Sequence, residues 1–423
     1  MGRIILTYHK YRYLLFIILA VAYIFVYFHR LCAAVVAVDM MEDLKTGGAL
    51  MGLLGSAYFY PYAAMQLPAG LLSDSWGPRK TITLFFVIAS IGSVMQGLAP
   101  TVMLAIAGRT LVGIGVAMLF VPTLKILSEW FKAKEFAVMT GFLIAMGGVG
   151  SLMATYPLAY LSNHVGWRAS FLLIGGITLV SALFIWLIVR DRPDDAGFAT
   201  AGGGTRPAGP RITLRDGVRQ VISHPRFWVI SVWFFFSCAV FFSFGGLWGG
   251  PYLMQVYGLS KSESGSILSM LAIGMIVGSP ALSYVSDSIF KARKPVIVIS
   301  SAMSLLVTAV LAFHTDGLPL AALYALCFLL GFFNNAIVVV GFTTSKELFP
   351  IQIAGTSTGL ANLFPFLGGA VAQPFLGYLI ERNGKISGSY PLQGYENAFF
   401  TLFICMIIAF AASLFIKETM DKK

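Results

Sequence analysis

Charged residues are scarce in this sequence of 423 residues, since Asp, Glu, Lys and Arg together make up only 11% of it. Hydrophobic residues make up 58%, and the mean hydropathy of +0.83 lies well above the range of soluble proteins. This composition excludes a soluble enzyme. If each membrane-spanning helix takes roughly 20 apolar residues, the chain holds about twelve spans and has no room for a sizeable domain outside the membrane.

Cysteine is also rare, and its placement excludes two further classes of protein. The four cysteines, Cys32, Cys238, Cys327 and Cys405, lie inside apolar stretches without metal-ligand spacing, so neither a disulfide framework nor a zinc site is expected. The chain also lacks an H-E-x-x-H motif and a phosphate-binding P-loop. We expect no enzyme activity and no cofactor, and a receptor would need a sensory domain for which there is no room.

Long apolar stretches account for most of the chain. Because they are continuous and do not alternate with a period of two, they predict helices and not a β-barrel. The expected spans are 13–38, 48–72, 81–98, 101–128, 137–161, 169–189, 227–250, 264–286, 295–313, 318–345, 355–380 and 397–416. The predicted fold class is all-α membrane, with twelve transmembrane helices.

The net charge of +11 is spread between these stretches and does not form one basic face, which argues against a nucleic-acid partner. Of the 29 Lys and Arg residues, 21 fall on the side of the termini, five on the opposite side and three inside spans. The positive-inside rule therefore places both termini on the cytoplasmic side of the membrane. We expect this to be the cell (inner) membrane. The first apolar run lacks an A-x-A cleavage site, so we expect it to be retained as a span.

The spans divide into two similar halves. Residues 191–226 have no apolar periodicity and are expected to form a cytoplasmic linker between a six-helix bundle at 1–190 and a second at 227–423. At a constant offset of 218 residues, eight identities join 129–161 to 347–379, among them Glu129 with Glu347 and Phe131 with Phe349. The chain is therefore expected to contain two pseudo-symmetric bundles, an architecture that supports alternating access.

The loop after the second span carries a motif formed by Gly70, Asp74, Gly77, Arg79 and Lys80. It resembles the G-x-L-x-D-x-x-G-x-R-K signature of the major facilitator superfamily. Ordinary positive-inside chemistry explains the two cations but not the aspartate with its two glycines. The resemblance implies a gating loop that latches one conformation, in which the carboxylate pairs with a cation or helix end of a neighbouring helix.

A degenerate copy of this motif follows the eighth span, with Asp287 followed by Arg293 and Lys294. This is the place where the superfamily has its second copy. The resemblance covers the whole chain and implies a secondary transporter, but the gating motif carries no information about the substrate.

Three cations stand inside the spans, whereas no carboxylate does. Arg30 and Arg109 both fall in the outer half of the membrane and could face one cavity. Alternatively, Arg30 snorkels to the interface and Arg109, which stands in a span-4 R-x-x-x-G-x-G pattern similar to that of the superfamily, serves helix packing. Lys125 lies near the cytoplasmic end of its span, where snorkelling competes with lining the inner vestibule.

The first span reads Tyr27-Phe-His29-Arg30, which resembles the Y-x-D-R entry of the organic-anion symporter branch with His29 in place of the acid. That resemblance implies that Arg30 engages an anionic substrate. The glutamate that carries the proton in that branch would fall at Val116, so this chain lacks that proton carrier. His29 is the one histidine in a span and is either a proton carrier or a structural residue.

Uncharged candidates complete the predicted site. Tyr58 and Tyr62, followed by Gln66, form a polar stripe that faces either the cavity or a neighbouring helix. Trp248 and Tyr252 lie in a glycine-rich stretch expected to break the seventh span, where they close a gate, stack on substrate or anchor at the interface. Asn362 either contacts the ligand or joins two helices.

The leading hypothesis is a monomeric transporter in the lipid bilayer that moves a small organic anion held by Arg30 with help from Arg109. Exchange or facilitated movement competes with proton symport through His29. The alternatives are a carrier of zwitterionic amino acids or short peptides, suggested by the loop that begins at Glu129, and drug efflux. Efflux ranks last because span 5 lacks that branch's proline and because the cavity is cationic.

Overall fold

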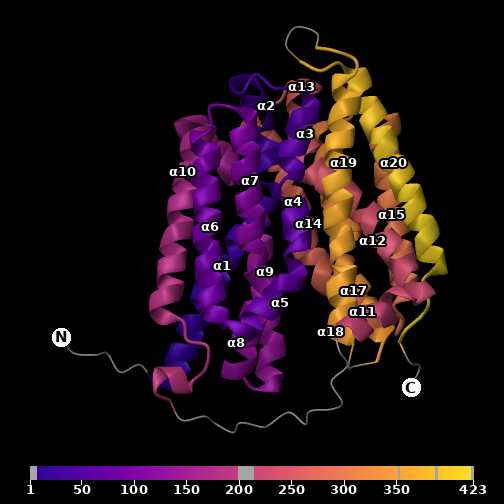
Figure 1. The fold of residues 1–423 in the computed structure, drawn as a ribbon. Helices are drawn as coiled ribbons and strands as arrows, with labels where there is room; N and C mark the ends of the chain where they lie inside the picture. Colours follow the sequence, from indigo (N-terminus) through magenta and orange to yellow (C-terminus); the bar gives the residue numbers. More distant parts are fainter. Residues whose placement is uncertain (1–6, 199–213, 351–352, 386–388, 421–423) are drawn as a thin grey trace.

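The computed structural model describes residues 7–198, 214–350, 353–385 and 389–420, and its regular elements are helices (Figure 1). Within these ranges ten helices are long and apolar enough to cross a membrane. The predicted all-α membrane fold is confirmed, with the helices gathered in two bundles. Several residues counted for orientation lie outside the described residues: Arg3, Arg206, Arg211, Lys422 and Lys423. So do residues 199–213 of the expected linker.

The first bundle contains the helices that precede the linker. Their bounds are α1 (Tyr8–Leu31), α2 (Ala33–Asp43), α3 (Gly48–Ser56), α4 (Phe59–Ala64), α5 (Gln66–Ser75), α6 (Pro78–Leu98), α7 (Val102–Ala117), α8 (Phe120–Trp130), α9 (Ala133–Met153) and α10 (Tyr156–Ile188). A short 3-10 turn, η1 (Asp194–Ala196), and helix α11 (Leu214–Ile222) follow.

The second bundle contains the remaining helices, with three π-helical segments among them. Their bounds are α12 (Pro225–Ser243), η2 (Phe244–Trp248), α13 (Gly249–Gln255), α14 (Lys261–Tyr284), η3 (Val285–Ile289), α15 (Lys294–Phe313), α16 (Leu320–Leu329), η4 (Leu330–Asn335), α17 (Val338–Glu347), α18 (Ala354–Ala361), α19 (Leu363–Glu381) and α20 (Leu392–Phe415). The seventh span stays helical from Pro225 to Gln255, and the glycine-rich stretch expected to break it contains the π-helical turn η2.

Several expected spans are divided into shorter helices, among them 48–72, 101–128 and 137–161. Proline lacks the N–H that would bond to the carbonyl four residues earlier, and these breaks fall about that distance before prolines. Pro61 and Pro68 follow the interruptions between α3, α4 and α5, Pro122 follows that between α7 and α8, and Pro157 follows that between α9 and α10. The apolar runs located the spans but overlooked these breaks.

Spans five and six are joined without a loop. Helix α10 runs from the end of one through the other, and only Gly166 has a non-helical backbone, with φ of 79° and ψ of 161°. Residues with side chains rarely adopt a positive φ, so glycine makes this one-residue corner possible.

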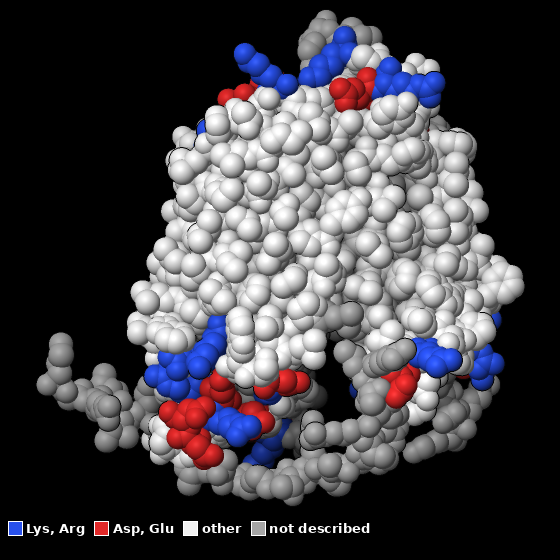
Figure 2. Space-filling model, viewed as in Figure 1, with Lys and Arg blue, Asp and Glu red and all other residues white. Residues whose placement is uncertain are grey.

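The two ends of the molecule differ in what they hold. One end, which we call the linker end, contains both ends of the described chain, α11 and the residues on either side of 199–213 (Figure 1). The opposite end, which we call the far end, contains α2, α3 and α13. On the face shown in Figure 2, Lys, Arg, Asp and Glu gather at the two ends and leave a band without charged side chains between them, as a membrane protein requires. The surface is hollowed between the bundles at the linker end (Figure 2).

At the far end the bundles meet backbone to backbone. A Cβ added to Gly48 of α3 would lie 2.7 Å from the carbonyl oxygen of Gly377 on α19, and one added to Gly377 would lie 2.2 Å from that of Gly48. Such close approach requires glycine on both helices. The structure is therefore closed at the far end, and the hollow between the bundles opens at the linker end.

Candidate substrate site

Arg30 lies in the last turn of α1, just before Cys32 separates α1 from α2. Its exposed fraction is only 7%, although both flanking helices continue toward the ends of the molecule. The side chain therefore does not snorkel to an interface. It lies between the bundles, in contact with residues from both.

Four aromatic rings surround the Arg30 guanidinium, and we call them the aromatic cage. The distances from its central carbon to the ring centroids are 4.2 Å for Tyr27, 5.3 Å for Tyr62, 5.0 Å for Phe366 and 5.8 Å for Phe242. Tyr27 and Tyr62 come from α1 and α4, whereas Phe242 and Phe366 come from α12 and α19 of the other bundle. The ring faces attract the cation but do not replace the oxygen acceptors that its N–H groups need.

The hydrogen bonding of Arg30 is incomplete. Its Nη2 donates to the Tyr62 hydroxyl over 3.3 Å. Its Nε is buried and has no partner, and among the described residues no carboxylate lies within ion-pair distance of the guanidinium. A buried cation without a counter-charge is costly, so this arrangement favours an anion at this point.

Arg109 occupies a different environment inside the first bundle. It is 1% exposed on α7, its Nη1 donates to Cys32 Sγ over 3.1 Å, and its guanidinium lies 5.3 Å from the centroid of the Tyr58 ring. The Tyr58 ring in turn stacks on Tyr62 at 5.5 Å. Tyr58 thus lies between the two arginines and is a neighbour of both.

The hydroxyl groups of the two predicted tyrosines make different hydrogen bonds, although both side chains lie next to Arg30. Tyr62 bonds the Arg30 guanidinium, whereas the Tyr58 hydroxyl donates to the carbonyl of Val26 over 3.1 Å. Tyr62 therefore belongs to the cage, and Tyr58 holds the wall behind it. The predicted stripe from Tyr58 to Gln66 is not one uniform cavity face.

An amide pair joins the bundles next to the cage. Asn362 lies between α18 and α19, and its Nδ2 donates to Gln66 Oε1 over 3.0 Å. Gln66 Nε2 donates to the backbone carbonyl of Tyr62 over 3.2 Å. Asn362 thus connects the second bundle, through Gln66 at the start of α5, to the backbone of a cage tyrosine.

Trp248 and Tyr252 lie away from the cage. Trp248 Nε1 donates to the Gln373 carbonyl over 2.9 Å, at the contact between α3 and α19. Tyr252 donates to the Thr315 carbonyl over 2.6 Å, and its ring centroid lies 4.6 Å from that of Phe399. Trp248 is therefore placed to close the far end, whereas Tyr252 packs within its own bundle.

His29 is fully buried, and neither ring nitrogen has a hydrogen-bond partner among the described residues. It precedes Arg30 in the last turn of α1, but within the described chain no hydrogen bond joins its ring to the cage. The structure therefore supplies no chain of hydrogen bonds through which His29 could exchange a proton with a ligand on Arg30.

Lys125 binds the gating motif. Its Nζ lies 2.6 Å from Asp74 Oδ1 and donates to the Ser73 carbonyl over 2.9 Å. The exposed fraction of the Asp74 side chain is 74%, so this is a surface ion pair. The expected pairing of the motif carboxylate with a neighbouring helix is thus present.

The other residues of the gating motif have surroundings different from those of Asp74. The N–H of Arg79 donates to Asp191 Oδ1 over 2.7 Å, and its guanidinium donates to the Trp186 carbonyl. Burial raises the pKa of Asp191. Gly77 has φ of 92°, whereas Gly70 has open space around its Cβ position and Lys80 is exposed. No described residue therefore packs closely against Gly70 in this conformation.

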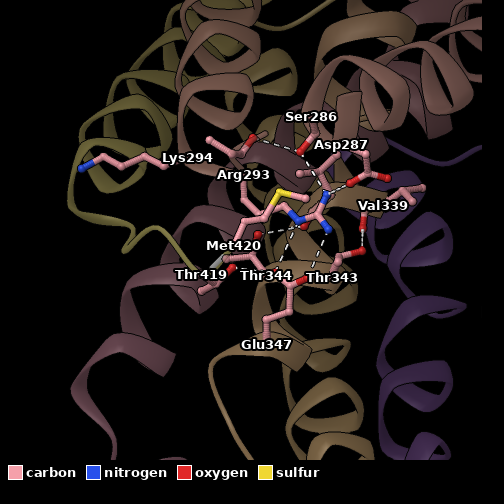
Figure 3. A network of polar contacts seen from close by, with 12 residues as sticks. Ser286, Asp287, Arg293, Lys294, Val339, Thr343, Thr344, Glu347, Thr419 and Met420 are labelled. Atoms are coloured by element: carbon pink, nitrogen blue, oxygen red, sulfur yellow. Dashed lines mark hydrogen bonds and ion pairs between the residues drawn. The ribbon is translucent and has the colours of Figure 1, made fainter. Parts of the chain in front are cut away.

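The second copy of the motif forms a compact network at the linker end (Figure 3). Arg293 forms an ion pair with Asp287 and another with Glu347 at 3.1 Å, while the Lys294 side chain points away. Glu418, beyond α20, accepts the N–H groups of Arg293 and Lys294 at 2.9 and 3.0 Å. The first residues of α15 are thus bound by the C-terminal segment.

A family model described as Major Facilitator Superfamily matches residues 19–372 and 247–423. The chain belongs to this superfamily and is a multi-pass membrane transporter, not an enzyme.

Curated relatives match nearly the full length. The chain is 25% identical over 403 residues to the "Probable sulfoacetate transporter SauU" of Cupriavidus necator, with 91% of each chain covered. It is 23% identical over 408 residues to the "Probable galactarate/D-glucarate transporter GudP" of Escherichia coli K12, with 89% of each covered. Among solved structures, an inward-facing, unoccupied bacterial homolog of the human lysosomal transporter Spinster matches with a TM-score of 0.75 at 20% identity, covering 96% of this chain and 97% of that one. This structural likeness concerns the fold.

Proposed function

We propose that the chain transports a small organic anion by alternating access, with the acid group of the substrate bound to Arg30. The observation that carries the proposal is the Arg30 guanidinium, which is buried between the bundles, surrounded by four rings and unpaired with any described carboxylate. The relatives named for sulfoacetate and for galactarate or D-glucarate support an anion as substrate. A zwitterionic ligand would bring a cation next to one that already lacks a partner.

Binding exchanges one hydrogen bond at the guanidinium. An arriving carboxylate or sulfonate takes the Arg30 Nη2 hydrogen bond now made to Tyr62 and uses the flat fork of donors for a second bond. Because the cage has walls from both bundles, the bound anion contacts both sides of the interface. Rocking of the bundles then carries the site from one face of the membrane to the other.

We further propose that the anion itself, and not a carboxylate of the protein, balances Arg30 during transport. Exchange or facilitated movement fits this arrangement, since no described hydrogen bond links His29 to the cage. The linker end then lies on the cytoplasmic side of the inner membrane, in keeping with the excess of Lys and Arg there. Residues 1–190 and 227–423 act as the two rocking domains of a monomer, joined by 191–226.

The test is uptake of sulfoacetate and of galactarate into liposomes that contain the purified protein. Arg30→Gln should lower uptake about 100-fold, as expected when one partner of a buried charge pair is removed. Arg226→Gln is the matched control, because Arg226 is exposed at the start of α12. Unchanged uptake by Arg30→Gln would refute the proposal, and uptake that follows an imposed pH gradient would refute exchange.

Ligand binding can be measured apart from transport. At a ligand concentration of 100 times Kd, binding stabilises the folded protein by about 2.7 kcal/mol, which a thermal-shift assay detects. We expect wild type to respond to the two anions and not to galactose, and Arg30→Gln to respond to none of them. Equal shifts in wild type and Arg30→Gln would place the site elsewhere.

A further inference from the structure

Helix α3 begins at the far end without a cap of its own. Its N-cap residue is Gly47, which has no side chain to accept the free N–H groups of the first turn. The N–H of Ala49 in that turn instead donates to Glu381 Oε2 over 2.8 Å. Glu381 is the last residue of α19, so the cap comes from the opposite bundle.

The carboxylate sits directly on the end of the helix. A Cβ added to Gly47 would lie 2.0 Å from Glu381 Oε1 and 2.5 Å from its Cδ. A carboxylate in this place binds the free N–H groups and is attracted by the positive end of the helix dipole. The absence of a side chain at Gly47 is what gives Glu381 access.

This contact crosses the interface where the backbones are closest. Next to it, Gly48 and Gly377 meet, and the Trp248 ring lies against both. Elsewhere at the far end, the ion pair of Lys261 on α14 with Asp39 on α2 also joins the two bundles. The cap on α3 and this ion pair are thus two electrostatic links across separate parts of the interface.

We propose that Glu381 is the latch of the far-end gate, holding the bundles closed by capping α3 across their interface. When the bundles rock apart at this end, the α3 terminus loses this cap and its N–H groups bond to water instead. The cap therefore stabilises the far-end-closed state and contributes nothing to the far-end-open state. The inference uses the alternating-access part of the proposed function and does not depend on an anionic substrate.

The test is the distance between the bundles at the far end, measured by double electron–electron resonance without substrate. Spin labels are placed at Pro100→Cys, in the exposed loop before α7, and at Asp316→Cys, in the exposed loop before α16. The partly exposed Cys405 is replaced by serine, and the other three cysteines are buried. Glu381→Ala should raise the ratio of long to short distances about fivefold, the factor that corresponds to one typical helix cap.

A second variant attacks the same contact from the other bundle. Gly47→Ala places a methyl group where the Glu381 carboxylate lies, and its φ of −92° suits alanine without strain. It should shift the distances in the same direction as Glu381→Ala.

Glu42→Gln is the matched control for both variants. A recess of about 550 Å³ at the far end is lined by both Glu381 and Glu42. Glu42 is an exposed carboxylate whose side chain makes no hydrogen bond with any described residue. Its distances should equal those of wild type. Unchanged distances in both Glu381→Ala and Gly47→Ala would overturn the proposal, as would an equal shift in Glu42→Gln. Because no substrate is present, these outcomes are independent of the uptake of sulfoacetate and galactarate.

Discussion

Arg30 and Arg109 are both arginines buried in the membrane region, yet their surroundings differ in origin. Rings from both bundles surround Arg30, whereas Arg109 contacts Cys32 and Tyr58 of its own bundle. A relative movement of the bundles changes the first environment and leaves the second intact. Burial of a charge therefore does not by itself identify a substrate site; the origin of its neighbours does.

The largest expected difference between the two arginines appears when each is changed to lysine. Arg30→Lys keeps the charge but loses the planar fork and its stacking on the rings, so the affinity for anion should fall at least about tenfold. Arg109→Lys should change this affinity less than about threefold, because the ring of Tyr58 lies between Arg109 and the cage. Titration calorimetry with sulfoacetate and galactarate measures both. Equal losses would mean that the two guanidinium groups act together.

The next effect concerns the cage wall supplied by the second bundle. Phe366→Leu removes a ring whose centroid is 5.0 Å from the guanidinium, and the affinity should fall roughly fivefold, as for a cation–π contact of about 1 kcal/mol. Phe364→Leu is the control, since Phe364 is two residues away and contacts Phe227 and Trp228. A loss in the control as large as that in Phe366→Leu would point to general damage to α19.

Removing single hydroxyl groups should separate the cage from the wall behind it. Tyr62→Phe deletes the acceptor for Arg30 Nη2, and the affinity should change by about two- to fivefold. Tyr58→Phe deletes the bond to the Val26 carbonyl, which should lower the stability by about 1 kcal/mol and leave the affinity unchanged. Anion-binding isotherms and melting temperatures of both variants decide between these outcomes. The distinction fails if Tyr58→Phe weakens binding and Tyr62→Phe does not.

The smallest effect is expected at Lys125, the third cation of the spans. Its ion pair with Asp74 is exposed, so Lys125→Gln should change the stability by less than about 1 kcal/mol. Anion affinity should equal that of wild type, because this side chain points to the gating motif. A loss of anion binding in calorimetry would mean that Lys125 contributes to the substrate cavity.

The sequence was sufficient to predict the spans because apolar length is read directly from it. Their interruptions were missed, although Pro61, Pro122 and Pro157 mark them, since hydropathy does not register a missing N–H. The place of Arg30 could be inferred because one cation among apolar residues stands out.

The rest of the cage could not be inferred in this way. Phe242 and Phe366 are two of 35 phenylalanines, and only the packing of two distant helices brings them to Arg30. Tyr252 shows the opposite case. Its position in a glycine-rich stretch predicted a site residue, but its ring packs in the core of the second bundle. The spacing of Gln66 predicts a polar stripe with Tyr58 and Tyr62, but its partner Asn362 lies 296 residues away in the sequence.

The segment after α20 also matters for how the protein is produced and handled. Glu418 holds the first N–H groups of α15, and the neighbouring Thr419 donates to Glu347 over 2.7 Å. A purification tag or fluorescent fusion joined before residue 420 would compete with these bonds. Tagged versions of the protein should therefore keep the chain through Lys423 and carry a flexible spacer after it.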